Sequence, residues 1–257
     1  MELISTLKNN KFLNITLAII TIILFVLFIL FRQTSTFRFD VYLTYKNSIS
    51  KSLLNTIIVS LIALIGSLVL GFIFYLLSVS KIKYLNYLVS LLREIVYGTP
   101  LLVMIVVMAF LIGPAFGSLN RVFLGTIALI LYMSPYMMNV FKAGISSIPE
   151  EQYLAMDLYN FTTFQKYRYI IIPQVIRVLM PPMMNNFSMI IKGSALLNVL
   201  AFNELFYQIS IIQPQTFAYI EGYLIMWILY LIVTIPLSVL SKQIEKRFSI
   251  WKLKLKI

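Results

Sequence analysis

Long runs without a charged residue dominate the hydrophobic pattern of this chain. They cover residues 12–31, 52–80, 95–120, 122–141 and 222–241. Since a helix needs about 20 apolar residues to cross roughly 30 Å of hydrocarbon, each run is long enough to span a bilayer. A further span is expected between Arg168 and Glu204, where Arg177 and Lys192 interrupt an apolar stretch and can extend their charged tips toward the interface. The pattern predicts an all-α integral membrane protein with about six transmembrane helices.

Composition agrees with a lipid environment and removes several kinds of chemistry. The 257 residues are 60% hydrophobic and 12% charged, whereas soluble domains carry about 25% charged residues. The chain has no Cys and no His, which excludes thiol nucleophiles and the ligands that zinc and iron sites most often use. It has no Gly-rich phosphate-binding loop followed by Lys and Ser or Thr, so we expect it to bind neither ATP nor any other cofactor itself.

The Lys and Arg residues predict the orientation of the spans. Cytoplasmic loops hold an excess of these residues, and with the N-terminus inside, the outer side holds only Arg32, Arg38, Lys46, Lys51 and Arg121. Both termini are therefore expected in the cytoplasm. No small-residue cleavage site follows the first run, which indicates an uncleaved anchor. The expected domains are an N-terminal anchor with an external segment, a transmembrane core and a basic cytoplasmic tail, at residues 1–50, 51–245 and 246–257.

The net charge of +12 raises two possible partners. Nucleic acid is not expected, because the cations are scattered over span ends and no soluble module presents them. Membrane lipid is the other candidate. The final KLKLKI either contacts anionic lipid or is simply solvated, and the sequence leaves both open.

The loop at residues 142–168 is the longest inner connection and the least lipid-like. Ser147, Pro149 and Glu150 have the form of a capping box, which predicts a helix that begins near Pro149. Leu154, Leu158 and Phe161 would share one face of this short amphipathic helix. It could rest on the inner leaflet or dock a cytoplasmic partner. Acids at 150, 151 and 157 favour the partner, because helices that lie on membranes usually carry basic polar faces.

Four segments in order resemble the permease subunits of ATP-binding cassette (ABC) importers, in the branch that takes up polar amino acids. They are VYGTPLLV at 96–103, KAGISSIPEEQYLAMDLYN at 142–160, IPQVIRVLMPPMMNNF at 172–187 and KGSALLNVLAFNEL at 192–205. The resemblance covers roughly residues 50–245 and implies a five-helix permease core behind the N-terminal anchor. It also implies that the cytoplasmic helix is a coupling helix for an ATPase, formed by Pro149, Glu150, Glu151, Tyr153, Leu154, Ala155, Asp157, Leu158 and Asn160.

The resemblance further implies the partners and the location. A cytoplasmic ATPase dimer would hold ATP and Mg and hydrolyse the nucleotide, so this chain would be a non-catalytic transport subunit. A second permease chain, identical or similar, would complete the membrane part, and an extracytoplasmic binding protein would deliver the amino acid. The expected location is the bacterial cytoplasmic membrane.

Several positions depart from the family pattern. The family commonly has Glu, Ala, Ala and then Gly in the loop, where this chain has Leu154, Ala155, Met156 and Asn160. Asn tolerates the left-handed conformation nearly as Gly does, whereas Leu154 removes a charge from the expected ATPase contact. The usual Arg before Gly, Thr and Pro is Tyr97, and the Glu and Arg common at the end of the fourth span are Asn139 and Lys142.

Polar residues within the spans mark a candidate substrate path, because such residues are costly in lipid and tend to face a cavity. The candidates are Asn185, Lys192, Gly193, Ser194 and Glu204; for the Asn and Ser residues, ordinary helix packing is the alternative. In the family an acid often follows the Lys, at the position of Gly193. Its absence favours neutral polar amino acids or cystine over cationic ones.

Two groups of helix-breaking residues are candidate hinges. Gly98, Thr99 and Pro100 are expected to break or bend the third span. Pro181 and Pro182 remove two successive backbone donors and disfavour a continuous helix, which would either expose backbone to a substrate or form a kink without a ligand.

Other functions are kept as alternatives. A stand-alone carrier or channel would often show an internal repeat and more acids within the membrane, and neither is evident here. A membrane enzyme would need an acid, base or nucleophile set, and only isolated candidates exist. An importer permease for another small solute is the nearest alternative.

Overall fold

The computed structural model describes residues 11–32 and 37–254. By its own contacts the chain divides into two units, Met1–Arg38 and Phe39–Ile257, and each is considered by itself. Lys8, Lys256 and the last residues of the predicted basic tail lie outside the described part.

In the first unit the described structure is one helix, α2 (Lys11–Arg32). Its apolar stretch is Leu13–Ile29, and Leu24, Phe25 and Phe28 are exposed within the unit. Polar groups are few, and the Thr21 hydroxyl donates back to the Leu17 carbonyl at 2.8 Å. Such a helix requires a lipid or a partner around it. The expected anchor segment extends further, to residue 50, but residues 39–50 belong to the second unit.

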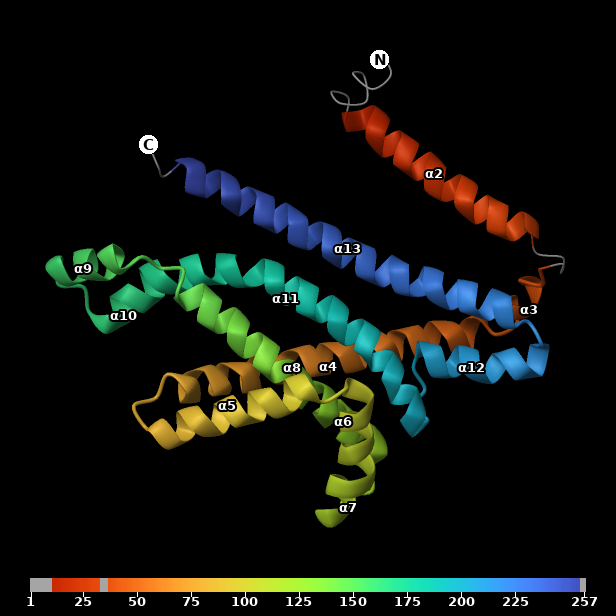
Figure 1. Cartoon of the computed structure of the whole chain (residues 1–257), viewed down its shortest axis with the longest axis horizontal. Coiled ribbons are helices and arrows are strands. Elements are labelled where there is room, and N and C mark those ends of the chain that lie inside the picture. Colours follow the sequence, from red (N-terminus) through yellow and green to blue (C-terminus); the bar gives the residue numbers. More distant parts are fainter. Residues whose placement is uncertain (1–10, 33–36, 255–257) are drawn as a thin grey trace. The chain divides into compact units, whose positions relative to one another are not determined.

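The second unit is all helical in its described residues, which confirms the predicted fold class. Its first half contains α3 (Asp40–Leu43), α4 (Lys46–Ser78), α5 (Lys83–Gly98), α6 (Leu101–Val107), η1 (Met108–Ile112), α7 (Gly113–Ala115) and α8 (Arg121–Ile145). Its second half contains α9 (Glu150–Leu158), α10 (Thr163–Gln165), η2 (Lys166–Ile171), α11 (Ile172–Ser194), η3 (Ala195–Leu200), α12 (Leu205–Thr216) and α13 (Tyr219–Lys254). As Figure 1 shows, α9 and α10 lie at the opposite end of this unit from α12.

Three helices of this unit, α4, α8 and α13, are long and apolar enough to cross a membrane. Two bent pairs add to them. Lys83–Gly98 and Leu101–Ala115 meet at 110°, and Thr163–Leu200 meets Leu205–Thr216 at 52°. The expected core of five spans follows if each bent pair crosses once.

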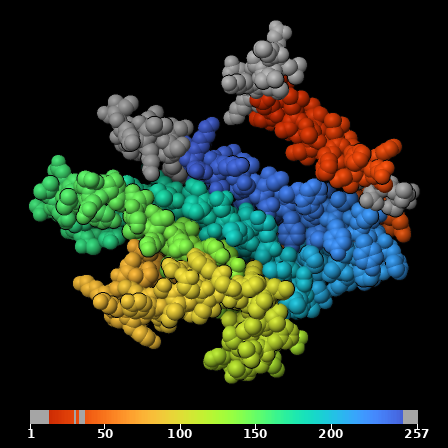
Figure 2. All heavy atoms as spheres, viewed as in Figure 1, coloured from red at the N-terminus to blue at the C-terminus, as the bar shows by residue number. Residues whose placement is uncertain are grey.

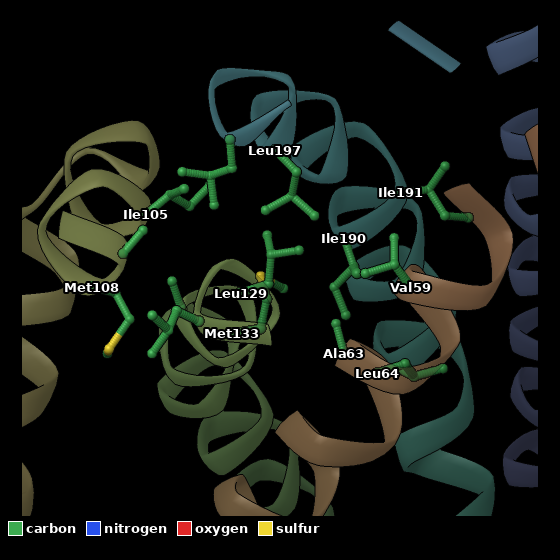
Figure 3. Close-up of a cluster of buried hydrophobic side chains, with 14 of the residues drawn as sticks. Val59, Ala63, Leu64, Ile105, Met108, Leu129, Met133, Ile190, Ile191 and Leu197 are labelled. Atoms are coloured by element: carbon green, nitrogen blue, oxygen red, sulfur yellow. The ribbon is translucent and has the colours of Figure 1, made fainter. Parts of the chain in front are cut away.

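The core forms where α4, α6 and η1, α8 and α11 meet. Figure 3 shows side chains from all of these helices gathering in one cluster, among them Ile105, Leu129, Met133, Ala63 and Ile190. Along α4 the buried positions include Ser60, Ala63, Ser67 and Gly71. Small residues let two helix backbones approach closely, which is the usual means of helix association in membranes. The α4–α8 pair is therefore the scaffold of the fold.

Two of the expected helix boundaries are wrong. The third span does not coincide with the uncharged run 95–120, because α5 begins at Lys83 and includes Arg93 and Glu94. The interruption expected at Pro181 and Pro182 is also wrong, since α11 runs through both prolines. The prolines cannot donate to the carbonyls of Arg177 and Val178, but α11 packs along α13 (Figure 1), and the Ser241 hydroxyl of α13 donates to the Pro181 carbonyl at 3.0 Å. Neighbouring helices and hydroxyl side chains are what make proline tolerable in such helices.

Candidate functional site

The first candidate site is the loop that connects α8 to α11. Helix α9 begins at Glu150 with Pro149 as its N-cap residue, as the sequence predicts. The capping box is wrong, however, because no side chain caps the helix and the Ser147 hydroxyl instead donates to the Gly144 carbonyl at 2.6 Å. Glu150 and Glu151 lie in the first turn, where negative charge interacts favourably with the helix dipole.

The two sides of α9 differ in what they contact. Met156 is buried together with Ile148, Ile171 and Val175, and Tyr153 and Phe161 pack against this cluster. Leu154 and Leu158 are 59% and 82% exposed. They share one side of α9 but face away from the protein, while Phe161 faces inward, so the expected common face is wrong for Phe161. The result is an exposed apolar surface on α9.

Polar contacts join α9 to α11 and to η2. The Gln174 side-chain amide of α11 donates to the side-chain oxygen (Oε1) of Gln152 at 3.0 Å, and Lys166 of η2 pairs with Asp157. Asn160 ends the helix in the left-handed conformation with φ of 51°, which confirms that Asn serves here in place of Gly. Burial raises the pKa of the Tyr153 phenol above its ordinary value of 10.0. Figure 2 shows α9 and α10 as a lobe at one end of the unit.

The second feature is the break between α5 and α6. Thr99 is extended (φ −106°, ψ 124°) and caps α5, Pro100 precedes α6, and the helices on either side meet at 110°. Proline disfavours the helical conformation in the residue before it, which explains why the helix ends here. The break predicted from Gly98, Thr99 and Pro100 is confirmed, and their role as a moving hinge stays a prediction.

The third feature is a polar groove between α11 and α13. It has a volume of about 330 Å³ and is lined by Asn185, Ser188, Met189, Lys192, Thr234, Ile235 and Ser238. Of the predicted path residues it contains Asn185 and Lys192. Thr234 and Ser238 on α13 were not predicted, and only their spacing of four residues, which places both on one helix face, could have suggested them.

The other predicted path residues lie elsewhere. A side chain at Gly193 would point at the core, since its Cβ would lie 2.9 Å from Leu101 and 3.8 Å from Leu129. Ser194 is fully buried and its hydroxyl donates to the Ile191 carbonyl at 2.8 Å. Glu204 is also fully buried and caps α12. In this conformation the structure thus brings together two of the five candidates.

Comparison with known proteins decides the family. A family model described as "Binding-protein-dependent transport system inner membrane component" matches residues 67–250. The chain belongs to this family. The predicted resemblance to ABC importer permeases, which was placed at roughly residues 50–245, is confirmed, and the protein is a multi-pass inner-membrane transport subunit.

Relatives of this importer permease have related names. It is 34% identical over 193 residues to the probable glutamine ABC transporter permease protein GlnM of Bacillus subtilis (strain 168), covering 75% of this chain and 89% of the relative. It is 30% identical over 189 residues to the putative glutamine transport system permease protein GlnP of Rickettsia conorii (strain ATCC VR-613 / Malish 7), covering 73% and 87%.

Solved structures show the same fold. The permease superposes on a chain from the crystal structure of an amino acid ABC transporter with histidines, with a TM-score of 0.74 and 29% identity, over 83% of this chain and 100% of the other. An inward-facing structure of the MetNI methionine ABC transporter matches with a TM-score of 0.59 at 15% identity, over 77% and 96%.

Two departures of this permease from the family pattern meet in the structure. The Asn139 amide of α8 donates to the Tyr97 hydroxyl of α5 at 2.7 Å, and the Tyr97 ring packs against Tyr136 with centroids 5.1 Å apart. The family commonly has Arg and Glu at the Tyr97 and Asn139 positions. In this permease a neutral hydrogen bond therefore joins α5 to α8 immediately before the break.

We expect a double-mutant cycle to show this pair as coupled. Tyr97→Phe and Asn139→Ala should each lower the free energy of unfolding by about 1 kcal/mol, and the double mutant should lose little more than either single mutant. Thermal unfolding of the purified permease in detergent measures this. Tyr84→Phe, on the same helix and 71% exposed, is the matched control. Fully additive losses would show that the two side chains do not interact.

Proposed function

We propose that this permease subunit moves amino acids into the cell by alternating access, driven by a separate ATPase that docks on α9. The exposed Leu154 and Leu158 surface carries the proposal, because exposed large apolar side chains on a cytoplasmic helix indicate a protein interface. Glu150 and Glu151 add negative charge at the first turn of the same helix, whereas Lys166 balances the charge of Asp157. Tyr153 and Ala155 complete the docking helix, and Asn160 ends it.

A groove of about 330 Å³ lies beside α9 and is lined in part by Ala155, Tyr159 and Phe161. It offers space for a side chain of the partner.

The attachment of α9 to α11 supports coupling. Met156 packs against Ile171 and Val175, and Gln152 is bonded to Gln174. Because α10, η2 and α11 follow each other without an intervening loop, movement of α9 displaces the helix that lines the polar groove. The break at Gly98, Thr99 and Pro100 would absorb part of that movement. Pro181 and Pro182 would let the continuous α11 bend, because each removes a backbone hydrogen bond from the helix.

The remaining partners follow from the family. The proposed assembly contains a second permease chain, two ATPase subunits that bind ATP and Mg, and an extracytoplasmic binding protein that delivers the substrate. Both termini lie in the cytoplasm. The substrate is an amino acid, with neutral polar ones or cystine preferred over cationic ones. The relatives named for glutamine support this preference.

The docking surface predicts a loss of ATPase binding in Leu158→Asp. Leu158 is 82% exposed, so the substitution removes no core contact, but it would bury an unpaired carboxylate in the interface at a cost of several kcal/mol. We expect at least a roughly tenfold decrease in the ATPase recovered per permease when the tagged chain is purified from its native membrane.

Phe116→Asp is the control for this experiment. Phe116 is 86% exposed and lies at the opposite end of α8 from the α9 loop, so ATPase recovery should be unchanged. Normal recovery and normal uptake with Leu158→Asp would exclude docking at this surface. If the unmutated chain is repeatedly recovered alone in mild detergents, the stand-alone carrier or channel is favoured instead.

A further inference from the structure

We propose that the turn between α12 and α13 is a docking point for the extracytoplasmic binding protein, with the ring of Phe217 as its anchor. This rests on the proposed function and goes further, because it assigns the contact with that partner to named residues of this chain. Phe217 directly follows α12 and is 80% exposed. Figure 1 shows α12 at the end of the unit opposite α9. Since α9 is the proposed cytoplasmic docking helix, the turn faces the outside.

The backbone of Phe217 is strained. Its φ of 54° and ψ of 18° are left-handed, which suits Gly at the end of a helix but is an outlier for a bulky side chain. Among the described residues other than Gly, φ is positive at Asn160, Ala201 and Phe217, and Phe217 has the largest side chain of the three. Residues held in such conformations cluster at functional sites. The strain therefore points to a role for the aromatic ring at this position.

Buried hydrogen bonds fix the turn on both sides of Phe217. The Tyr42 hydroxyl donates to the Ala218 carbonyl at 2.8 Å, and the Gln213 side-chain amide donates to the Tyr219 carbonyl at 3.0 Å. The side chains of Tyr42 and Gln213 are both buried. The Phe217 amide itself donates to the Gln213 carbonyl at 2.8 Å. An exposed ring on a fixed backbone is a suitable anchor for a protein interface, because little conformational freedom is lost when it binds.

The turn lies beyond the hydrocarbon of the membrane. The Tyr45 hydroxyl, directly before α4, donates to the side-chain oxygen of Gln215 at 3.3 Å, so the end of α12 lies beside the start of α4. Helix α4 carries Lys46 and Lys51 before its uncharged run begins, and charged residues avoid hydrocarbon. Tyr and Trp are the aromatic residues enriched at the headgroup level. The exposed ring of Phe217 therefore indicates a protein partner rather than lipid.

Charge near the turn favours an acidic partner. The segments that pack beside it expose two cations, Lys46 and Lys51, and one acid, Asp40. The acids that flank α12 and begin α13, Glu204 and Glu221, are buried. The exposed charge is therefore net positive, and it would attract a binding protein whose docking face carries Asp and Glu.

Photo-crosslinking in the native membrane identifies the partner. Phe217 is replaced by p-benzoylphenylalanine, which keeps an aromatic ring at the turn, and the adduct is identified by mass spectrometry. We expect a protein adduct with an extracytoplasmic solute-binding protein. The same probe at Tyr84, which is exposed in the first turn of α5 and follows the far end of α4, should not crosslink to it. Adducts with lipid alone would overturn the proposal and make the ring a membrane anchor.

The affinity of the crosslinked binding protein, once purified, measures the contribution of Phe217. The permease is purified with its ATPase and reconstituted in nanodiscs. We expect Phe217→Gly to raise the Kd about tenfold or more. Its unfolding midpoint should be unchanged or raised, because Gly adopts the left-handed conformation without strain. Phe116→Gly is the matched control, since Phe116 is 86% exposed in the connection between α7 and α8, and it should leave the Kd unchanged.

Lys46→Glu provides a second variant that acts through charge. Lys46 is the first residue of α4, where an acid interacts favourably with the helix dipole, so the fold should be retained. We expect the Kd to rise about threefold at low salt, mainly through slower association. The difference from the unmutated protein should shrink as the salt concentration rises.

The possible outcomes separate the two proposals. If no solute-binding protein crosslinks to the permease or stimulates ATP hydrolysis by the unmutated complex, the proposed function is wrong. If a binding protein stimulates hydrolysis, and its Kd is unchanged in Phe217→Gly and Lys46→Glu, only the docking turn is overturned. An equal loss of affinity in Phe217→Gly and Phe116→Gly would also overturn it, because the effect would not be specific to this turn.

Discussion

Replacing Gly71 with Ala will destabilise the permease by about 3 kcal/mol, although Ala is intrinsically the better helix former by about 1 kcal/mol. A Cβ atom at this position would lie 2.6 Å from the Cβ of Met137 and 2.8 Å from the Ser134 carbonyl oxygen. It would also lie 3.0 Å from the Met138 amide nitrogen. A change of rotamer cannot relieve contacts with the backbone, so α4 and α8 would have to separate.

Thermal unfolding of the purified protein in detergent measures the loss, and we expect the midpoint to fall by roughly 6–12 °C. Gly98→Ala is the matched control, because a Cβ there meets nothing within 4 Å. It should leave the midpoint unchanged or slightly raised. Equal midpoints for the two variants would show that α4 and α8 do not depend on close backbone approach at Gly71.

The sequence predicts the spans well where hydrophobicity alone decides them. The helices α4, α8 and α13 each contain most or all of one uncharged run, because the hydrocarbon requires about 20 apolar residues in a helix that crosses it. The bounds predicted for the third span are wrong because this span includes charged residues. Arg93 and Glu94 form an ion pair at 2.8 Å within α5, so the charged residues that were expected to precede the span lie inside its first helix. For this span the sequence predicts only the break at Thr99 and Pro100, because proline disfavours a helical conformation in the residue directly before it.

The sequence predicts only part of the structure of the α9 loop. The local effects of Pro149 and Asn160 specified where the helix begins and how it ends. The sequence does not predict which side of the helix packs inward. That side depends on Ile171 and Val175, which lie further along the chain and pack with Met156 only in the folded protein. Leu154 and Leu158 were therefore expected beside Phe161, although they face outward.

The sequence also predicts only part of the groove between α11 and α13. Lys192 was conspicuous as a cation in an apolar stretch. Thr234 and Ser238 were not, because hydroxyl side chains in helices often bond their own backbone, as Thr234 does. The antiparallel pairing of α11 with α13 that brings these residues to Lys192 requires the fold. The structure also differs from the role predicted for Glu204 in the substrate path. A carboxylate within a span can be stabilised either by facing a cavity or by accepting hydrogen bonds from backbone donors. Here the donors are N–H groups of α12.

Replacing Glu204 with Ala will unfold the α12 region rather than merely slow transport. The Glu204 carboxylate accepts from the Phe206 amide at 2.9 Å, from the Tyr207 amide at 2.6 Å and from the Tyr230 hydroxyl at 3.1 Å. It is fully buried, so Ala leaves these donors without a partner in a site that excludes water. Each unsatisfied buried donor costs about 1–3 kcal/mol, and the loss of an N-cap costs about 1 kcal/mol. We expect a total loss of more than about 3 kcal/mol and a lower yield of intact permease.

Two comparisons decide between this capping role and the predicted role of Glu204 in the substrate path. Glu204→Gln keeps an oxygen that can accept from the α12 amides, so it should retain most of the stability, while Glu94→Ala, an exposed acid on α5, should lose little. Thermal unfolding, yield and uptake are measured for each variant. If Glu204 instead contacts substrate, Ala and Gln should both impair uptake in a protein of normal stability. Because capping acts on the fold and substrate contact acts on transport, the unfolding midpoint of Glu204→Ala separates the two roles before any substrate is known.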